Sequence, residues 1–314
     1  MVIKNIHMFF KKILKNPGLL FMKHRYSRSF YSYISLTINN IFESKQKREW
    51  QQKLYQENSN KIDDKLGYLL TDDSFFKNSQ LIMKVYSDTN SIISKNIENQ
   101  GGSKSFLKNI LDINDLEKFP SILKLGLEPK ILSTVSTYLK SSPLLVKVKL
   151  LKSKVNNDLN TSSQLFHLDH EDRNNVKVFI HLNDVDRDTG PFTLVAKDLS
   201  KKFANEKKYK YSGEGSHIKE ADASSLYKKQ IQVLGPKGTV LLVDTCNVFH
   251  YGSAQNIKER YVLYFNYVKY SSFTYSAFFL NLLPQKFLKN YFPYLRYAKN
   301  LKDERIFALG ANRL

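Results

Sequence analysis

Between residues 143 and 268 the chain is a series of short apolar segments separated by turn residues, and this pattern constrains the fold most. Val146, Val148 and Leu150 alternate with Lys147 and Lys149, which is the period of two expected of a β-strand. Further strands are predicted at 164–168, 176–182, 192–195, 231–234, 239–243 and 261–268. No helical pattern alternates with these segments, so an antiparallel sandwich or barrel is predicted in preference to a parallel α/β sheet.

The segments before and after this region have different patterns. Helices are predicted over 76–86 and 128–140, with a loop at Gly101-Gly102-Ser103 between them, and the tail returns to a helix-like pattern. The predicted class is therefore mainly β with flanking helices (α+β). We expect three parts: a basic amphipathic segment at 1–60, a helical lead-in with the β core at 61–270, and a basic, aromatic, helical extension at 271–314.

The N-terminal segment is basic and carries apolar residues near helical spacing. Phe9, Phe10, Ile13 and Leu14 are interleaved with lysines, and residues 1–50 hold ten lysines and arginines against two glutamates. Two interpretations stay open. The segment could pack as a helix on the main domain, or it could lie on an anionic membrane surface.

Charge and cysteine content limit the functional classes. The single cysteine, Cys246, excludes a disulfide framework and a cysteine-rich metal site, and it is typical of a cytoplasmic protein. The net charge of +20 favours anionic partners, but no nucleic-acid-binding motif accompanies it, so no nucleic acid is expected. No apolar stretch is long enough to span a membrane. The predicted location is cytoplasmic, with attachment to the periphery of a membrane as the alternative.

A His-x-Asp pair ends the apolar segment 164–168. Side chains at positions i and i+2 of a strand point to the same face, so His167 and Asp169 could both reach one metal ion. A second pair, His170 and Asp172, follows at once and is the alternative. The first pair is preferred because it directly follows the apolar residues Leu165 and Phe166, whereas the second pair falls in a polar loop.

A distal histidine and an arginine complete the constellation. His250 follows the apolar strand 239–243, and two imidazoles with one carboxylate form the facial triad of non-haem iron(II). Arg260 comes ten residues later and opens the strand 261–268, where its guanidinium could hold a carboxylate through two hydrogen bonds. Lys258 is the substitute candidate for this role.

Several segments resemble the phytanoyl-CoA dioxygenase family. They are Gln164–Asp169, Lys177–Val185, Asp188–Phe192, Gly238–Thr245 and His250–Ser253. The resemblance implies a double-stranded β-helix (jelly roll) and an oxidoreductase that uses iron(II), 2-oxoglutarate and dioxygen. It also implies that His167, Asp169 and His250 bind the metal, that Arg260 binds a 2-oxoglutarate carboxylate, and that Phe179 lines the cosubstrate pocket.

The chain departs from the family pattern after the Gly-Pro strand. Ala196-Lys197-Asp198-Leu199 stands where the family has a Pro-Gly-Ser-His-like turn, so the family's substrate cannot be carried over. The expectation is a dioxygenase that hydroxylates a small organic or lipid-like substrate. The alternatives are an inactive jelly-roll binding protein or a peripheral membrane protein, each with a relic metal site. His181 and Lys177 share the parity of Phe179 and are expected at the core or rim of the same cavity.

Overall fold

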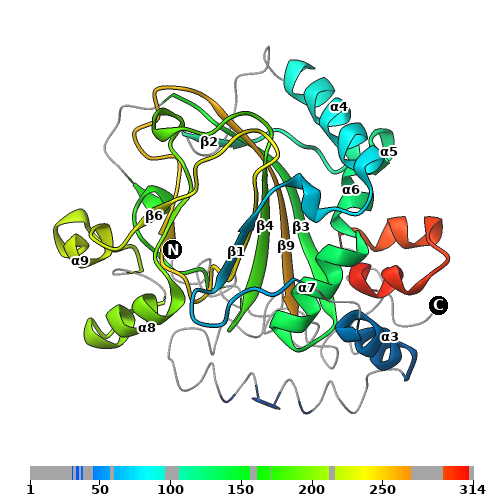
Figure 1. The fold of residues 1–314 in the computed structure, drawn as a ribbon, viewed down its shortest axis with the longest axis horizontal. Coiled ribbons are helices and arrows are strands. Elements are labelled where there is room, and N and C mark those ends of the chain that lie inside the picture. The colour runs from blue at the N-terminus through cyan, green and yellow to red at the C-terminus, as the bar shows by residue number, and fades with distance from the viewer. Residues whose placement is uncertain are drawn as a thin grey trace, which may run out of the picture.

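The computed structural model describes residues 45–56, 60–95, 106–155, 161–170, 172–211, 216–269 and 293–310, with residues 30, 33, 34 and 37. Over these residues the chain forms two antiparallel sheets, one of six strands and one of three (Figure 1). The large sheet has the order β1 (Tyr68–Thr71), β7 (Val240–Val243), β4 (Asn175–His181), β9 (Arg260–Lys269), β3 (Pro143–Ser153) and β2 (Leu107–Asn109). The small sheet has the order β6 (Ile231–Gln232), β5 (Thr193–Leu194) and β8 (His250–Tyr251).

This arrangement confirms the predicted class, which is mainly β with flanking helices in a jelly roll. Neighbours in the large sheet are far apart in sequence, since β4 pairs with both β7 and β9. The small sheet faces the interior side of the large one, where Leu194 and Val233 pack with Leu241 and Val243 of β7. A small pocket lies between the two sheets, lined by Phe179 and Leu241 of the large sheet and by Phe192 and Val233 beside the small one.

Alternation along β4 separates two environments. Val176, Val178 and Ile180 are fully buried in the main hydrophobic core. Lys177 and Phe179 project from the opposite face, because successive side chains of a strand point to opposite sides of the sheet. The helical side of the sheet is thus apolar, and the side that faces the small sheet carries polar and aromatic groups.

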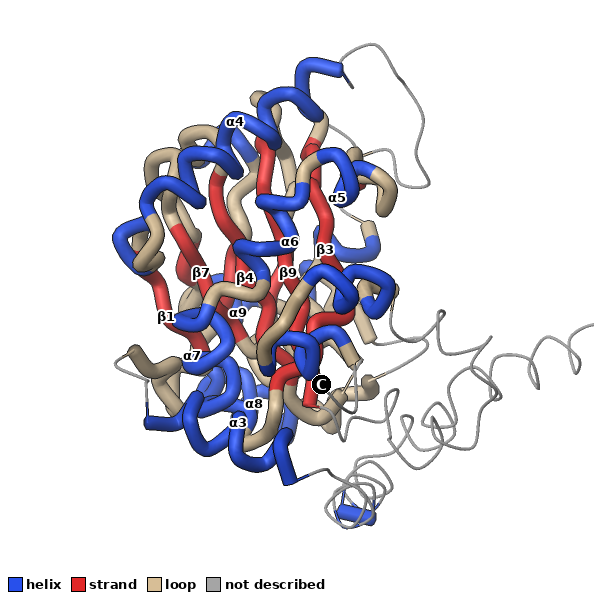
Figure 2. The backbone as a smooth tube through the Cα atoms, turned by 90° about the vertical axis from the view of Figure 1, so that its right-hand side faces the viewer, coloured by secondary structure: helices blue, strands red, loops and turns tan. Residues whose placement is uncertain are grey.

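The helices fall into two groups on opposite sides of the large sheet (Figures 1 and 2). One group covers its outer face: α3 (Lys45–Gln56), α4 (Ser79–Lys95), α5 (Asp115–Lys118), α6 (Pro120–Gly126) and α7 (Pro129–Leu139). The other group, α8 (Lys197–Glu206) and α9 (Ser224–Tyr227), lies on the side of the small sheet. Short 3₁₀ turns are η2 (Asp73–Phe75), η3 (Ser162–Gln164), η4 (Arg187–Thr189), η5 (Glu220–Asp222), η6 (Leu295–Asn300) and η7 (Glu304–Leu309).

Local chemistry explains where α7 and a critical turn are placed. Glu128 caps α7 by accepting hydrogen bonds from the backbone N–H groups of Lys130 and Ile131, and Pro129 occupies the first turn, where a missing N–H costs nothing. The predicted turn before β5 has Gly190 at φ 61°, and a Cβ there would meet Asn256 at 2.8 Å. Glycine is therefore required at that turn.

The structure corrects part of the predicted secondary structure. The strand predicted at 164–168 is wrong, because Thr161 and Gln164 form a capping box that starts η3, and only isolated bridges at His167 follow. The helix predicted at 76–86 begins at Ser79 and continues to Lys95. The remaining predicted strands are present, although β5 and β6 are only two residues long.

Segments outside the β region share its core. Trp50 and Leu54 of α3 and Phe307 of η7 belong to the same hydrophobic cluster as the large sheet. The division at residues 60 and 270 stays a prediction. The apolar residues of the stretch 9–14 and the tail aromatics at 278–292 lie outside the described residues. Within the described part of the chain, no helix combines the length and apolar character of a membrane span.

Candidate metal centre

The three predicted metal ligands lie close together beside β8 of the small sheet. His167 and His250 exchange backbone hydrogen bonds of 3.1 Å in both directions, so β8 and the segment before Asp169 lie side by side. One ligand atom from each of His167, Asp169 and His250 can be chosen so that all lie within 4.8 Å of one another. Asp169 and His250, which are 81 positions apart in sequence, are thus brought close together.

The two imidazoles are held in the orientation that a metal ligand needs. His167 Nδ1 lies 2.9 Å from the carbonyl oxygen of Leu165, and His250 Nδ1 lies 2.9 Å from the carbonyl oxygen of Val248. A carbonyl can only accept, so each Nδ1 carries the proton and donates it. Each Nε2 is then left with its lone pair, which is the arrangement that outer hydrogen bonds impose on metal-binding histidines.

The electrostatics of the site leave His167 and Asp169 in the protonation states that bind a cation. Burial lowers the pKa of His167 to about 3, and the nearby His250 adds to this effect. Burial acts to raise the pKa of Asp169, but the charge of Lys177 and the two imidazoles outweigh it and hold that pKa well below its usual range. At neutral pH the site therefore presents a neutral His167 and an ionised carboxylate.

Lys177 is an additional charged group at this centre. Its ammonium forms an ion pair with Asp169 Oδ2, and both side chains are largely buried. Sequence reasoning placed Lys177 on the interior face but gave it no role, because a lone lysine in a strand carries no motif. The structure places it in direct contact with the carboxylate that a metal would use.

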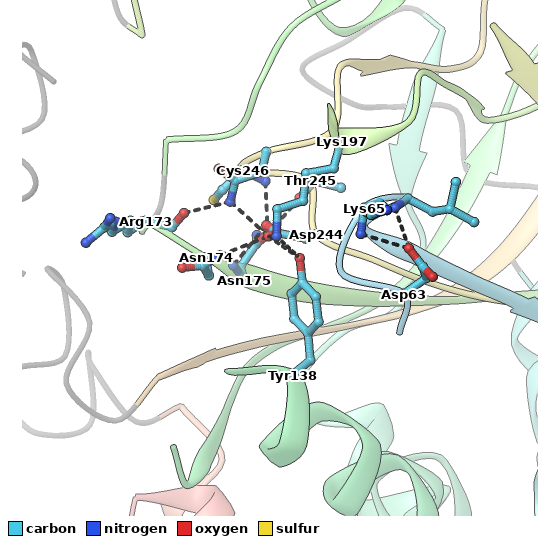
Figure 3. Close-up of polar contacts among 12 residues, drawn as sticks. Asp63, Lys65, Tyr138, Arg173, Asn174, Asn175, Lys197, Asp244, Thr245 and Cys246 are labelled. Atoms are coloured by element: carbon cyan, nitrogen blue, oxygen red, sulfur yellow. Dashed lines mark hydrogen bonds and ion pairs between the residues drawn. The ribbon is translucent and has the colours of Figure 1, made fainter. Parts of the chain in front are cut away.

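A buried polar network fixes the loop that supports Asp169 (Figure 3). The backbone N–H of Asp169 donates to the carbonyl oxygen of Thr245 at 2.9 Å. The preceding carboxylate, Asp244, is fully buried and accepts from the Tyr138 hydroxyl at 2.7 Å and from the Asn174 amide at 3.0 Å. Burial raises the pKa of Asp244, and Lys197 and these donors offset part of that rise. The network thereby anchors the Thr245 carbonyl against α7.

The second His-x-Asp pair lies elsewhere. His170 is exposed and is not part of the cluster of possible ligands found among the described residues. Asp172 is buried, and its Oδ1 accepts from the backbone N–H of Arg173. The structure therefore brings together the first pair and His250, which was the preferred register.

Arg260 lies at a pocket between the sheets. The pocket is lined by Phe179, His181, Phe192 and Arg260, among other residues. Arg260 is 6% exposed, and its Nη2 contacts the hydroxyls of Ser153 and Ser253 at 3.3 and 3.2 Å.

No described carboxylate pairs with Arg260, and its buried Nε has no hydrogen-bond partner among the described residues. Burial lowers the pKa of Arg260 to about 10, so the group still carries its charge at neutral pH. A buried cation without a counter-ion is costly. The arrangement fits a site that an anionic ligand completes. The substitute candidate, Lys258, instead lies at the surface and pairs with Asp186 and Asp188.

Stacked rings connect the pocket to the metal centre. Phe192 stacks on His250 with ring centroids 5.2 Å apart, and it contacts Phe179 at 4.9 Å. Phe179 in turn stacks on Tyr264 at 5.2 Å. Phe179 and Phe192 both line the pocket of Arg260, so one short apolar wall runs from that guanidinium to a candidate metal ligand.

The donor set fits a divalent ion of the iron type. Two imidazoles and a carboxylate suit non-haem iron(II), whereas a structural zinc site would use four closed ligands. Metal–ligand bonds of about 2.1 Å place neighbouring donor atoms roughly 3 Å apart. His250 Nε2 and Asp169 Oδ2 are 3.7 Å apart, so a modest side-chain adjustment would close the site on an ion.

His217 is a neighbour that sequence reasoning missed. Its ring lies 5.0 Å from that of His167, and the two residues form an isolated antiparallel bridge. The sequence around His217 has no metal-ligand spacing to either predicted pair. Only the path of the chain beyond α8 reveals its position.

Comparisons with known proteins find solved structures to which this chain is similar at low identity. EctD from S. alaskensis with bound Fe is 16% identical, with 67% of this chain and 75% of that chain covered and a TM-score of 0.49. HygX from Streptomyces hygroscopicus with nickel and 2-oxoglutarate bound is 14% identical, with 66% and 84% covered and a TM-score of 0.42. The non-haem alpha-ketoglutarate-dependent epimerase SnoN from nogalamycin biosynthesis is 11% identical, with 71% and 83% covered and a TM-score of 0.43.

No model of a known protein family matches the sequence. No curated protein matches it either. Membership of the phytanoyl-CoA dioxygenase family therefore stays a prediction.

Proposed function

We propose that this protein is an iron(II)- and 2-oxoglutarate-dependent dioxygenase. The observation that carries the proposal is the pairing of two neighbouring features of the structure. One is a cluster of two imidazoles and one carboxylate. The other is a buried guanidinium that has no described acidic partner, at a pocket joined to the cluster by Phe192.

Each residue of the site has a defined task in this proposal. His167, Asp169 and His250 hold iron(II) on one face and leave other coordination positions open. Arg260 binds the carboxylate of 2-oxoglutarate that lies far from the metal, through its guanidinium, whose Nε–H has no partner among the described residues. Phe179 and Phe192 line the path between them and exclude water from it.

When bound, iron with 2-oxoglutarate and dioxygen supplies an oxidation of the organic substrate, coupled to conversion of 2-oxoglutarate to succinate and carbon dioxide. The chain's own contribution is orientation. The Leu165 and Val248 carbonyls fix the two imidazole rings, and the Thr245 carbonyl fixes the backbone of Asp169. Hydroxylation of a small organic or lipid-like molecule is the reaction proposed.

Turnover of 2-oxoglutarate tests the proposal. Purified protein is incubated with 2-oxoglutarate under air, with iron(II) or with a chelator, and succinate is measured. We expect slow succinate formation that requires iron even before the substrate is known. A matched protein carrying Asp169→Asn should form none. Equal succinate with and without iron, or none from the wild type under any condition, would reject the proposal.

One observation favours a second candidate, which is a jelly-roll binding protein with a relic metal site. The Lys177 ammonium already satisfies the Asp169 carboxylate, so the fold can compensate that charge without an ion. In the oxygenase, iron(II) must draw Asp169 away from Lys177. The variant Lys177→Met therefore distinguishes the oxygenase from the binding protein. It should strengthen iron binding in an oxygenase, since two cations no longer compete for one carboxylate. A wild type and a variant that both bind no iron would favour the relic.

A further inference from the structure

A hollow of about 380 Å³ opens beside α8, next to the metal centre. Phe203, Tyr209 and Ile218 give it an apolar part. Phe203 is buried, and the Tyr209 hydroxyl accepts from the backbone N–H of Leu168 at 3.1 Å. The hollow therefore rests on the same segment that carries His167 and Asp169.

The rest of the lining is strongly basic. Lys207, Lys208, Lys210 and Lys219 line the hollow, and Asp222 is the one acidic residue there. None of the four lysines has an ion pair with a carboxylate of the described residues. Lysines dispersed over a basic surface are ordinary, but four around one concave space produce a positive potential that draws in anions.

Lys208 also occupies an unusual backbone conformation. It lies two residues after Glu206, the last residue of α8, and has φ 47°, in the left-handed region where chains leaving a helix usually place glycine. A side chain at such a position has a conformational cost, and costs of this kind gather at functional sites. Retaining a lysine there is consistent with a use for its charge.

His217 connects the hollow to the metal centre. It lines the hollow, and its ring lies 5.0 Å from the ring of His167. A molecule with its charged end among the lysines and its body on Phe203 and Tyr209 would thus extend toward the His167 side of the metal.

We propose that this hollow binds the substrate of the oxygenase, and that the substrate is a phosphate monoester with an apolar body. This inference rests on the proposed function for the reaction, but the binding chemistry stands on the hollow itself. Lysine ammonium groups recognise phosphate as point charges, and the apolar part of the lining suits a carbon skeleton. Both parts of the lining are needed, so neither a neutral analogue nor inorganic phosphate should bind as well.

Calorimetric titration of the metal-free protein with phenyl phosphate, benzoate, phenol and inorganic phosphate tests the binding chemistry. We expect phenyl phosphate to bind at least about tenfold more tightly than each of the other three, with an affinity that falls as salt is raised. Benzoate or phenol binding more tightly than phenyl phosphate would overturn the proposal, and so would a lack of phenyl phosphate binding.

Matched charge reversals locate the binding. Lys207→Glu with Lys210→Glu should weaken phenyl phosphate binding at least about tenfold, because both positions line the hollow. Lys201→Glu with Lys202→Glu, at exposed positions of α8 that do not line it, is the control with the same charge change. An equal loss of phenyl phosphate affinity in both double variants would show a general charge effect and overturn the assignment of binding to the hollow. Lys208→Gly is a separate check, since it should raise the melting temperature while weakening binding.

A separate measurement distinguishes failure of this inference from failure of the proposed function. Manganese(II) is bound in place of iron, and the ³¹P relaxation of phenyl phosphate is recorded with wild type and His167→Ala. We expect enhanced relaxation in the wild type alone. Manganese binding without enhancement would overturn the substrate role of the hollow and leave the oxygenase intact. No manganese binding at the cluster would overturn the proposed function, and the substrate role with it, whatever the calorimetry shows.

Discussion

The two faces of β4 carry opposite kinds of chemistry within seven residues. On the helical side, Val176, Val178 and Ile180 are fully buried in the main core. On the interior side, Lys177 contacts a candidate metal ligand and Phe179 lines the pocket of a buried guanidinium. The same backbone hydrogen bonds hold both faces in register.

This difference shows how the fold divides its tasks. Apolar burial on the helical face supplies stability, at about 25 cal/mol per Å² of apolar surface removed from water. The interior face holds groups that reduce stability unless a ligand completes them, such as Arg260 without a described acidic partner. Changes on the two faces should therefore separate function from stability.

The largest effect is expected from removing a ligand on the interior side. His250→Ala should lower iron(II) affinity by more than the roughly 10- to 100-fold that loss of an outer partner costs, and abolish 2-oxoglutarate turnover. His170→Ala is the matched control, because His170 is exposed and outside the cluster. Anaerobic iron titration compares the two. Equal iron(II) affinities in the two variants would contradict the assignment of the metal site to the interior face.

The next largest effect concerns Arg260. Arg260→Met should weaken 2-oxoglutarate binding by about 2–5 kcal/mol, since the ligand's carboxylate would be left buried and unpaired. The free energy of unfolding of the ligand-free variant should stay equal or rise, because an uncompensated buried charge is removed. Calorimetry and denaturant unfolding measure the two quantities. Lys258→Met, at the surface, should change neither. A large decrease in the free energy of unfolding of Arg260→Met would contradict the view that groups on the interior face reduce stability when no ligand is bound.

The opposite pattern is expected on the helical face. Ile180→Ala should lower the free energy of unfolding by about 3 kcal/mol, because it leaves a cavity in a fully buried position. Iron affinity of the folded variant should not change. Ile180→Val, expected to cost about 1 kcal/mol, provides a graded control. An iron affinity that falls in step with stability would show that the two faces are not independent.

The smallest effect is a pH dependence from the interior face. Burial, with the charge of Arg260, lowers the pKa of His181 to about 3, so the folded protein favours its neutral form. The stability that His181 contributes is complete above its ordinary pKa near 6.5 and is lost as pH falls from there toward 3.

Over that range one such histidine changes the free energy of unfolding by about 1.4 kcal/mol per pH unit. His181→Gln should therefore reduce the slope of stability against pH between 6.5 and 4 in the metal-free protein. Urea unfolding at several pH values measures the slope. Identical slopes for wild type and variant would show that His181 does not titrate as its burial implies.

Sequence patterns predicted the parts of the molecule that depend on local periodicity. The alternation along β3 and the position of Arg260 at the start of β9 followed from apolar spacing. β8, which has only two residues, was not predicted. The segment 164–168 was predicted as a strand from its apolar residues, but the capping box at Thr161 imposed a turn.

The site was predictable only where its residues share a motif. His-x-Asp and a distal histidine after a strand identified the three candidate ligands. Lys177 and His217 have no such spacing, and they reach the site because β4 and the chain beyond α8 pass beside it. The support of the Thr245 loop by Asp244 and Tyr138 depends on contacts 106 residues apart and leaves no sequence signal.

Iron stoichiometry tests the central claim most directly. The protein is dialysed anaerobically against iron(II), with and without 2-oxoglutarate, and the metal bound per chain is measured for wild type and for Asp169→Asn. We predict one iron per wild-type chain, held more tightly when 2-oxoglutarate is present, and a large loss in the variant. A wild type that binds no stoichiometric iron, or a variant that binds it equally well, would contradict the account.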